Sequence, residues 1–292
     1  MDLTAIADRL WPGRVGAVAV LGAGITRHNA RVTLDTGESY VLRAGGRDTE
    51  LLGIRRDREY EASLIAAAVG VGPQVVELLE PEGIVVTRWI EGEVVTIERL
   101  RQPATLRRVA LALRAVHAGP PLPGRFDAFR VVEEYRSIVF SYGAAVPPSY
   151  AWARQVARQV EAARGRAPER PCHNDLVAAN VIDDGRRIRI VDWEYAGMGD
   201  VFYDLACIAV HAGLDAEGRA ALLDAYADRP TAHERRALEL MRFMADFREA
   251  MWALAQSAVA EVDYDFPEHA ERHFERLRQT AEEPSFQEAL AS

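Results

Sequence analysis

The stretch CHNDLVAANVI, residues 172–182, places His173, Asp175 and Asn180 in the order H-x-D-x-x-x-x-N between apolar neighbours. The strand-like residues NVI end this stretch, GRR predicts a turn, and IRIVD ends at Asp192. A tight hairpin of these two strands would bring Asp192 beside the loop that carries Asp175 and Asn180. We therefore expect three oxygen-bearing side chains to meet at one end of a short hairpin.

These side chains suit the transfer of a phosphoryl group. Carboxylate and amide oxygens are the ligands that Mg²⁺ prefers, while water and phosphate complete its shell. With Asn180 and Asp192 on the metal ion, Asp175 is free to accept the proton of an attacking hydroxyl, which is the division of roles in kinases. The alternative is that Asp175 and Asn180 only cap turns, but an Asp after a predicted hairpin favours catalysis. We expect His173 to brace the loop through hydrogen bonds.

The composition is that of a soluble globular protein. The chain has 292 residues, of which 49% are hydrophobic and 27% charged. No apolar run is long enough to span a membrane, the first residues do not resemble a secretory signal, and two distant cysteines indicate a reduced cytoplasm. The net charge of −9 argues against a nucleic-acid partner and is compatible with a cationic substrate or with ordinary solubility. All 35 basic residues are arginine, so any phosphate contact from a cationic side chain must use arginine.

The pattern of apolar residues divides the chain into two parts. Residues 18–43 and 73–90 alternate as strands joined by turns, and residues 56–70 between them have helical spacing. After residue 92 the pattern becomes helical. Further helices are expected near residues 106–117, 131–141, 149–164, 201–213, 215–228, 232–260 and 268–282. We therefore predict an N-terminal nucleotide-binding lobe over residues 1–88 and a helical lobe over residues 89–292 that holds the catalytic loop and the substrate site.

A family resemblance supports this division. HNDLVAANVI, followed by VDWEYAGMGDVFYDLA at residues 191–206, resembles the choline/ethanolamine kinase branch of the aminoglycoside phosphotransferase superfamily. The resemblance implies an α+β, bilobal, protein-kinase-like fold with a β-rich N-lobe and a mainly helical C-lobe. It implies that Asp175 is the catalytic base and that Asn180 and Asp192 bind Mg²⁺, with Glu194 near the metal or the substrate. Asp200 and Asp204 would support the catalytic loop.

The stretch LGAGITRHNARV, residues 21–32, is the candidate phosphate-covering loop. It is not a dinucleotide-binding motif, because the third glycine is missing and strand-like residues follow. A glycine-containing turn between antiparallel strands fits a kinase better, although an ordinary hairpin turn is the alternative. The stretch is similar to the family pattern G-G-x-T-N, with Ala23 and Arg27 as departures. Gly24, Thr26 and Asn29 are therefore expected to contact the nucleotide.

Other contacts with ATP follow from the third strand and the connector. SYVLRAGG supplies Arg43, which can bind the α- and β-phosphates through two parallel hydrogen bonds. Its carboxylate partner is expected to be Glu59, with Glu61 as the alternative, unless the pair is only a surface ion pair. The resemblance suggests that the backbone of Arg88 and Ile90 contacts the adenine edge.

The acceptor site is less clearly marked. The segment FMADFREAMWALAQSAVAEVDYDFPEHA, residues 243–270, is similar to acceptor-side helices that show R-E-x-x-W. A cationic alcohol would need aromatic faces and carboxylates around it. Besides Asp175 and Glu194, the candidates are Tyr195, Trp252, Asp263, Tyr264 and Asp265. Trp252 could instead belong to the core, and His211 stands where an acidic residue would suit choline.

The sequence thus predicts an ATP- and Mg²⁺-dependent kinase of a small hydroxylated, cationic metabolite such as choline or ethanolamine. An aminoglycoside or a thiamine-like molecule is an alternative acceptor. A nucleotide-binding pseudokinase with a regulatory role is a further alternative, although a non-catalytic protein would not need Asp175, Asn180 and Asp192 together.

Overall fold

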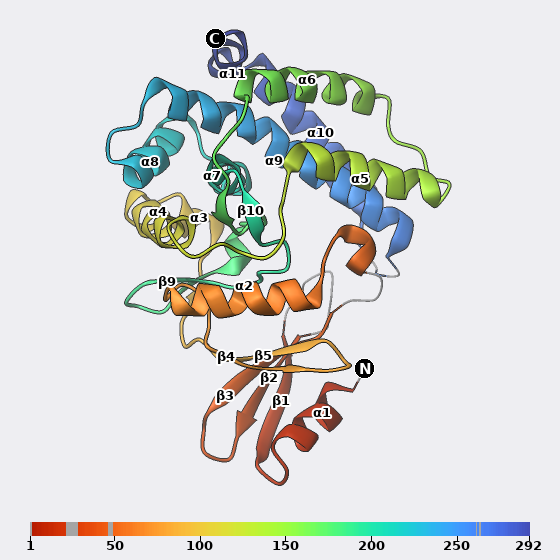
Figure 1. Cartoon of the computed structure of the whole chain (residues 1–292), viewed down its shortest axis with the longest axis vertical. Coiled ribbons are helices and arrows are strands. Elements are labelled where there is room, and N and C mark those ends of the chain that lie inside the picture. Colours follow the sequence, from red (N-terminus) through yellow and green to blue (C-terminus); the bar gives the residue numbers. More distant parts are fainter. Residues whose placement is uncertain (1, 22–28, 46–48, 261, 263) are drawn as a thin grey trace.

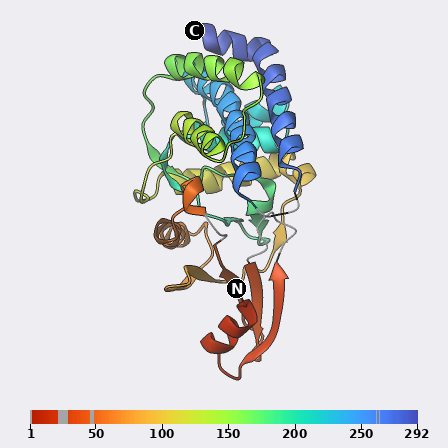
Figure 2. The ribbon, with the colours of Figure 1, turned by 90° about the vertical axis from the view of Figure 1, so that its right-hand side faces the viewer.

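The computed structural model describes residues 2–21, 29–45, 49–260, 262 and 264–292. Its sheet and its helical bundle are stacked along the long axis of the molecule, with the N-terminus on the sheet and the C-terminus at the far end of the bundle (Figures 1 and 2). The predicted fold, with a β-rich N-terminal part and a helical C-terminal part, is confirmed.

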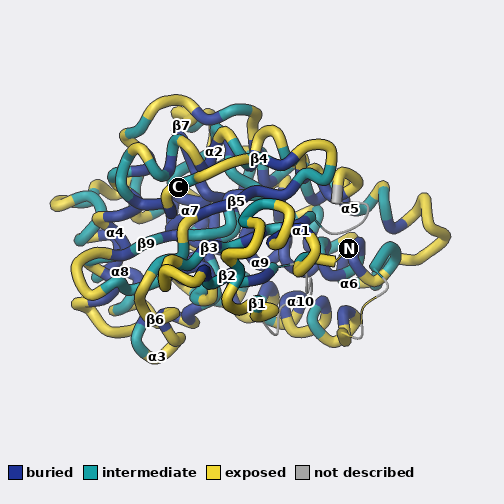
Figure 3. The backbone as a smooth tube through the Cα atoms, turned by 90° about the horizontal axis from the view of Figure 1, so that it is seen from below, coloured by how far each residue is buried: buried dark blue, intermediate teal, exposed yellow. Residues whose placement is uncertain are grey.

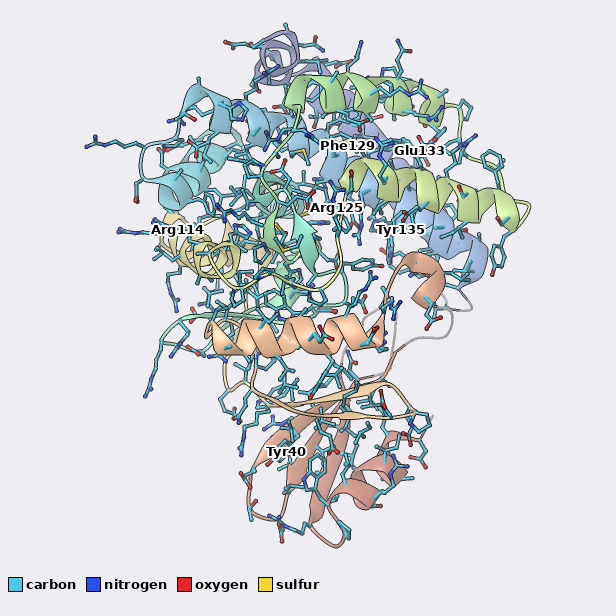
Figure 4. All side chains as sticks on the ribbon, in the orientation of Figure 1. Tyr40, Arg114, Arg125, Phe129, Glu133 and Tyr135 are labelled. Atoms are coloured by element: carbon cyan, nitrogen blue, oxygen red, sulfur yellow. The ribbon has the colours of Figure 1, made fainter. Side chains whose placement is uncertain are left out.

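The N-terminal part is built on a five-stranded antiparallel sheet in the order β1-β2-β3-β5-β4. The strands are β1 (Val15–Leu21), β2 (Asn29–Leu34), β3 (Ser39–Arg43), β4 (Val75–Leu79) and β5 (Ile84–Arg88). Along β2 and β3, successive residues alternate between buried and half-buried, so one face of the sheet is buried. Figure 4 shows Tyr40 on this sheet. Helix α1 (Leu3–Leu10), which was not predicted, adds Ile6 and Ala7 to the small core of this sheet.

Helix α2 (Arg56–Ala68) lies between the sheet and the bundle (Figure 1). It buries Glu59, Ala62, Ser63 and Ala66 and ends before Gly70, which has a positive φ of 77°. Glycine adopts this left-handed conformation without the steric cost of a side chain. Helix α2 therefore carries a buried glutamate, Glu59, to the boundary between the two parts.

The C-terminal part surrounds the 28-residue helix α9 (Ala232–Val259). A capping box between Thr231 and Glu234 starts this helix, and from Leu240 to Ala250 almost every residue is buried. Figure 3 shows buried backbone, in dark blue, in the interior of the molecule and exposed loops at its edge. The surrounding helices are α3 (Ile97–Leu100), α4 (Pro103–His117), α5 (Ala128–Ser141), α6 (Ser149–Arg164), α7 (Val201–His211), α8 (Ala216–Ala227), α10 (Phe266–Glu282) and α11 (Pro284–Ala291).

Short strands carry the catalytic loop. Strands β6 (Glu93–Val94), β8 (Val181–Asp183) and β9 (Ile188–Ile190) form one small sheet, and β7 (Arg170–Cys172) pairs with β10 (Gly197–Gly199). The predicted hairpin of NVI and IRIVD is confirmed as the β8–β9 pair. Short 3₁₀ turns cover Thr49–Leu52 and Ala178–Asn180. In the part of the chain that the structure describes, no helix is both long and apolar enough to cross a membrane.

Candidate active site

The loop after β7 carries Asp175 and is fixed by a buried carboxylate. Both oxygens of Asp204, at the start of α7, accept hydrogen bonds from the loop backbone, from the His173 amide at 2.8 Å and the Asn174 amide at 2.7 Å. His117 contacts the same carboxylate at 3.0 Å, and the Asp204 side chain is fully buried. Asn174 has a positive φ of 66°, which costs free energy for a residue with a side chain. The charged acceptor offsets this cost.

His173 braces the loop from within, in agreement with its expected structural role. Its Nε2 donates to the Val191 carbonyl at 2.9 Å, and its Nδ1 accepts from the Asp175 amide at 3.2 Å. Because a carbonyl can only accept and an amide can only donate, these two bonds fix one neutral tautomer of the imidazole. The histidine therefore ties the Asp175 loop to the strand that leads into Asp192.

Asn180 and Asp192 lie at the ends of the hairpin strands, next to Asp175. The side-chain amide of Asn180 donates to the backbone carbonyl of Asp175 at 3.0 Å, which leaves its amide oxygen to bind a metal ion. Asp192 follows β9 with a positive φ of 71°. Backbone strain of this kind is common at functional sites, where the surrounding structure enforces it.

Arg43 reaches this loop from the sheet. Its Nε donates to Glu59 at 2.9 Å, and its Nη2 donates to Asp192 at 2.6 Å and lies 3.6 Å from Glu194. Glu59, which is 1% exposed, also pairs with Arg56 of the same helix. Glu59 is thus the partner of Arg43, and the alternative Glu61 is not. The pairing is buried and joins β3, α2 and the catalytic hairpin, unlike an exposed surface pair.

The carboxyl groups of this cluster differ in their proton affinity. Burial and the neighbouring Asp192 carboxylate raise the pKa of Glu194 from 4.5 to about 8. Burial opposes the ionisation of Asp192 too, but the Arg43 guanidinium outweighs it and lowers the pKa of that carboxyl. Burial raises the pKa of Asp175, and Arg248 counteracts part of this effect. Two carboxyls with opposite shifts in one site are typical of functional sites.

Helix α9 contacts Asp175 through Arg248. Arg248 donates from Nη1 to Asp175 at 2.7 Å and to Glu249 at 2.5 Å, and its guanidinium lies 4.3 Å from the centre of the Tyr195 ring. The Arg248 side chain is only 2% exposed. The sequence did not assign Arg248 or Glu249 a role. The signal was present, because adjacent charges interrupt the apolar stretch FMADFREAMW.

A cavity of about 160 Å³ lies among these groups. Its lining includes seven residues predicted for the site, namely Asn29, Arg43, Asp175, Asp192, Glu194, Tyr195 and Trp252. Residues that were not predicted also line it, among them Arg56, Arg248, Glu249 and Gln256. The structure therefore brings nucleotide, metal and acceptor candidates from both parts of the chain to one space.

The remaining nucleotide candidates are placed differently. Gly24 and Thr26 lie outside the described residues. The Arg88 amide donates to the Gln74 carbonyl at 2.8 Å, and its side chain lies 3.2 Å from Glu38. The Arg88 amide is therefore taken up by the sheet and is not available to a ligand.

Some expected supports and acceptor residues have other partners. Asp200 caps α7 and pairs with Arg164 at 2.8 Å, so unlike Asp204 it does not hold the loop directly. Tyr264 contacts His269 at 2.8 Å, Asp265 caps α10, and Asp263 lies outside the described residues.

Guanidinium groups with free donors make the cavity suitable for an anionic ligand. Nε of Arg56, and both Nε and Nη2 of Arg248, are buried without a hydrogen-bond partner among the described residues. Buried donors without a partner are uncommon in proteins. Phosphate oxygens are strong acceptors for arginine, and Asp192 with Asn180 supplies the oxygen donors that Mg²⁺ prefers. The residues present thus fit a magnesium nucleotide.

Comparison with known proteins decides the family. Residues 17–240 match the model of the phosphotransferase enzyme family. This match covers the five-stranded sheet from the third residue of β1 onward, and the loop that carries Asp175. The chain belongs to the phosphotransferase enzyme family. The predicted membership of the aminoglycoside phosphotransferase superfamily, and with it the prediction of a small-molecule kinase, is confirmed at this level.

Relatives point to one branch of this family. Protein LicA of Haemophilus influenzae is 26% identical over 276 residues, which cover 89% of this chain and 78% of LicA. Mouse ethanolamine kinase 2 is 26% identical over 271 residues, which cover 81% of this chain and 68% of that kinase. A crystal structure of a choline/ethanolamine kinase family protein from Mesorhizobium loti has a TM-score of 0.86 and 28% identity, with 99% of this chain and 98% of that chain covered.

More distant structures share the fold. Choline kinase LicA from Streptococcus pneumoniae has a TM-score of 0.80 at 23% identity, and covers 95% of this chain and 96% of its own. The protein-kinase-like fold expected from the sequence is therefore confirmed by solved structures as well.

Proposed function

We propose that the protein transfers the terminal phosphoryl group of ATP, in the presence of Mg²⁺, to the hydroxyl of a small cationic amino alcohol of the choline or ethanolamine type. One observation carries the proposal: Asp175, Asp192 and Arg43 line the same small cavity although they come from three separate segments of the chain. This is the division of parts on which kinase catalysis depends. We also propose that residues 1–88 and 89–292 act as two lobes that hold the nucleotide between them.

Each side chain has a role that its position supports. Asp175 orients the acceptor hydroxyl and takes its proton, because its loop is fixed by Asp204 and by His173. Asn180 and Asp192 would hold Mg²⁺, which neutralises charge on the phosphates. Arg43, which Glu59 orients, binds the phosphates in place of the lysine that many kinases use. Positioning and electrostatic stabilisation then account for catalysis.

The nucleotide contacts of the sheet complete this arrangement. Asn29 lines the cavity at the start of β2, and we propose that Gly24 and Thr26 cover the phosphates with it. The backbone of Arg88 and Ile90 would meet the adenine. These contacts position the terminal phosphoryl group toward Asp175, so that an acceptor on the α9 side can attack in line.

The acceptor side supports a small cation. The Glu249 carboxylate and the rings of Tyr195 and Trp252 line the cavity beside Glu194, and carboxylates and aromatic rings attract ammonium ions. Relatives named as ethanolamine kinase and choline kinase support the same class.

A coupled assay of ADP release over a panel of alcohols tests the proposal. The panel contains choline, ethanolamine, thiamine and two aminoglycosides, each with and without Mg²⁺. We expect Mg²⁺-dependent ADP release with choline or ethanolamine that greatly exceeds the rate without acceptor. A flat response over the panel, together with a thermal shift by Mg·ATP that shows nucleotide binding, would favour a regulatory nucleotide-binding protein instead.

A further inference from the structure

A second cluster of ionisable side chains lies next to the cavity, where α7, α9 and α10 meet. One donor atom each from Glu249, His269 and His273 lies within 4.8 Å of the other two. Nε2 of His269 is 3.6 Å from Oε2 of Glu249. The rings of His269 and His273 stack with 4.7 Å between their centres. We refer to these three residues as the Glu249–His269–His273 cluster.

The histidines of this cluster are oriented by polar partners. Nδ1 of His269 contacts the Tyr264 hydroxyl at 2.8 Å, and Nδ1 of His273 contacts the buried Asp246 carboxylate at 2.7 Å. Such contacts from one ring nitrogen are the rule for metal-binding histidines, because they fix the tautomer and the direction of the other nitrogen. Nε2 of His269 is in fact buried with no hydrogen-bond partner among the residues described. A buried polar atom of this kind calls for a ligand.

We propose that the Glu249–His269–His273 cluster binds a divalent transition-metal ion of the zinc class, at a site separate from the Mg²⁺ of phosphoryl transfer. Two imidazoles and one carboxylate form a ligand set that Zn²⁺ uses in proteins, with a fourth position open to water. Tetrahedral ligands at usual bond lengths lie roughly 3.3 Å apart. The candidate ligand atoms all lie within 4.8 Å of one another, so small side-chain movements can bring them to this spacing. His211, whose Nε2 is 3.9 Å from Glu249, is available for the fourth position.

The surrounding charges set limits on this site. Arg248 pairs with Glu249, and Arg276 lies 3.2 Å from Asp246, so two cations lie next to these carboxylates. They oppose a further positive charge, and we therefore expect binding weaker than in structural zinc sites. The ion pair of Arg248 with Glu249 links the site to catalysis, because Arg248 also pairs with Asp175. A metal ion bound to Glu249 would weaken the Glu249–Arg248 ion pair, so that Arg248 would pair mainly with Asp175.

Calorimetric titration of the full chain with Zn²⁺ alone, without nucleotide or acceptor, tests the binding. We expect about one ion per chain, and a loss of affinity of at least about 10-fold in His269→Gln. His273→Gln is the second variant, and Tyr264→Phe, which removes only the orienting hydroxyl, should have a smaller effect. His233→Gln, which changes a histidine at the start of α9 that is not part of the cluster, is the matched control and should bind as the unchanged protein does.

Visible absorption of bound Co²⁺ gives an independent readout, since a tetrahedral site with nitrogen and oxygen ligands produces strong bands. Thermal unfolding of each variant without metal shows that it is folded. The proposal is overturned if the unchanged protein does not bind Zn²⁺, or if folded His269→Gln and His273→Gln bind it with unchanged affinity.

The link to catalysis is measured separately and rests on the proposed kinase activity. With Mg·ATP and acceptor present, we expect added Zn²⁺ to lower the rate of ADP release in the unchanged protein and in His233→Gln but much less in His269→Gln. Equal inhibition in all three would show that Zn²⁺ acts at the magnesium site, and would refute the link while leaving the calorimetric result standing. Absence of any ADP release would concern the proposed function, not the metal site.

Discussion

The two aspartates that we propose for catalysis, Asp175 and Asp192, are each paired with an arginine, but the two arginines are held in different ways. On the side of the cavity formed by the five-stranded sheet, Arg43 is 16% exposed and forms ion pairs with Glu59, Asp192 and Glu194. On the α9 side, Arg248 is 2% exposed and pairs with Asp175. Arg43 comes from a strand at the boundary of the two parts, whereas Arg248 belongs to the central helix of the bundle.

This difference indicates how the cavity can work. An arginine at a strand end, with three carboxylate neighbours, can exchange one of them for phosphate at small structural cost. An arginine in the packed core cannot move far without opening the core, because protein interiors are closely packed. We infer that the sheet side adapts to the nucleotide and that the α9 side fixes the position of Asp175. The predictions below test this contrast.

The largest effect is expected at Asp192, the proposed metal ligand, which pairs with Arg43. In Asp192→Asn we expect kcat/KM to fall by about 10³-fold or more. The neutral amide binds Mg²⁺ less strongly than the carboxylate does, and Mg²⁺ neutralises the charge on the phosphates. The assay is coupled ADP release with the best acceptor of the panel. Asp35→Asn, which changes an exposed carboxylate in the β2–β3 turn, should keep its rate. A rate of Asp192→Asn close to that control would refute its role.

A pair of matched substitutions separates the two arginines. In Arg248→Met we expect the free energy of unfolding to fall by about 3 kcal/mol, because Asp175 and Glu249 would lose their buried counter-charge. In Arg43→Met we expect a much smaller loss of stability, because Arg56 remains as the counter-charge of Glu59. We also expect this variant to show a marked loss of ATP affinity. Denaturant unfolding and nucleotide titration measure these effects. Equal losses of stability in both variants would remove the contrast between the two sides.

The smallest effect concerns the pH dependence of stability. The folded-state pKa of Glu194, raised to about 8 from 4.5, means that the folded protein holds a proton that the unfolded chain releases. The contribution of Glu194 to stability is therefore fully present below its unfolded pKa and is lost as pH rises through its folded pKa. We expect the melting temperature to fall less between about pH 5 and about pH 9 in Glu194→Gln than in the unchanged protein. Parallel pH profiles of the two proteins would show that Glu194 does not titrate in this way.

The features that the sequence predicted are mostly local. Asp175, Asn180 and Asp192 fall within eighteen residues and one hairpin, so spacing and turn signals were enough to bring them together. The long helices were predicted from their apolar periodicity. Glu59, 16 residues after Arg43, was expected as its partner because it lies on the following helix at the spacing of the resembled family.

The features that the sequence did not predict depend on tertiary packing. Arg248 and Asp175 are 73 residues apart, and their contact requires α9 to pass directly behind the catalytic loop. The positive φ of Asp192 is enforced by its surroundings and is not marked by a glycine. Helices α1 and α11 are only eight residues long and have too few turns for a clear apolar period. The Asp2 cap and Pro284 were the local signals for them.

Single-turnover transfer of labelled terminal phosphate from ATP to choline or ethanolamine tests the central claim most directly, because it follows the phosphoryl group itself. The account predicts a labelled phosphoester with the unchanged protein, and a rate at least about 10²-fold lower in Asp175→Asn with nearly unchanged ATP affinity. A labelled product formed by Asp175→Asn at close to the original rate would contradict the assignment of Asp175 as the group that activates the acceptor.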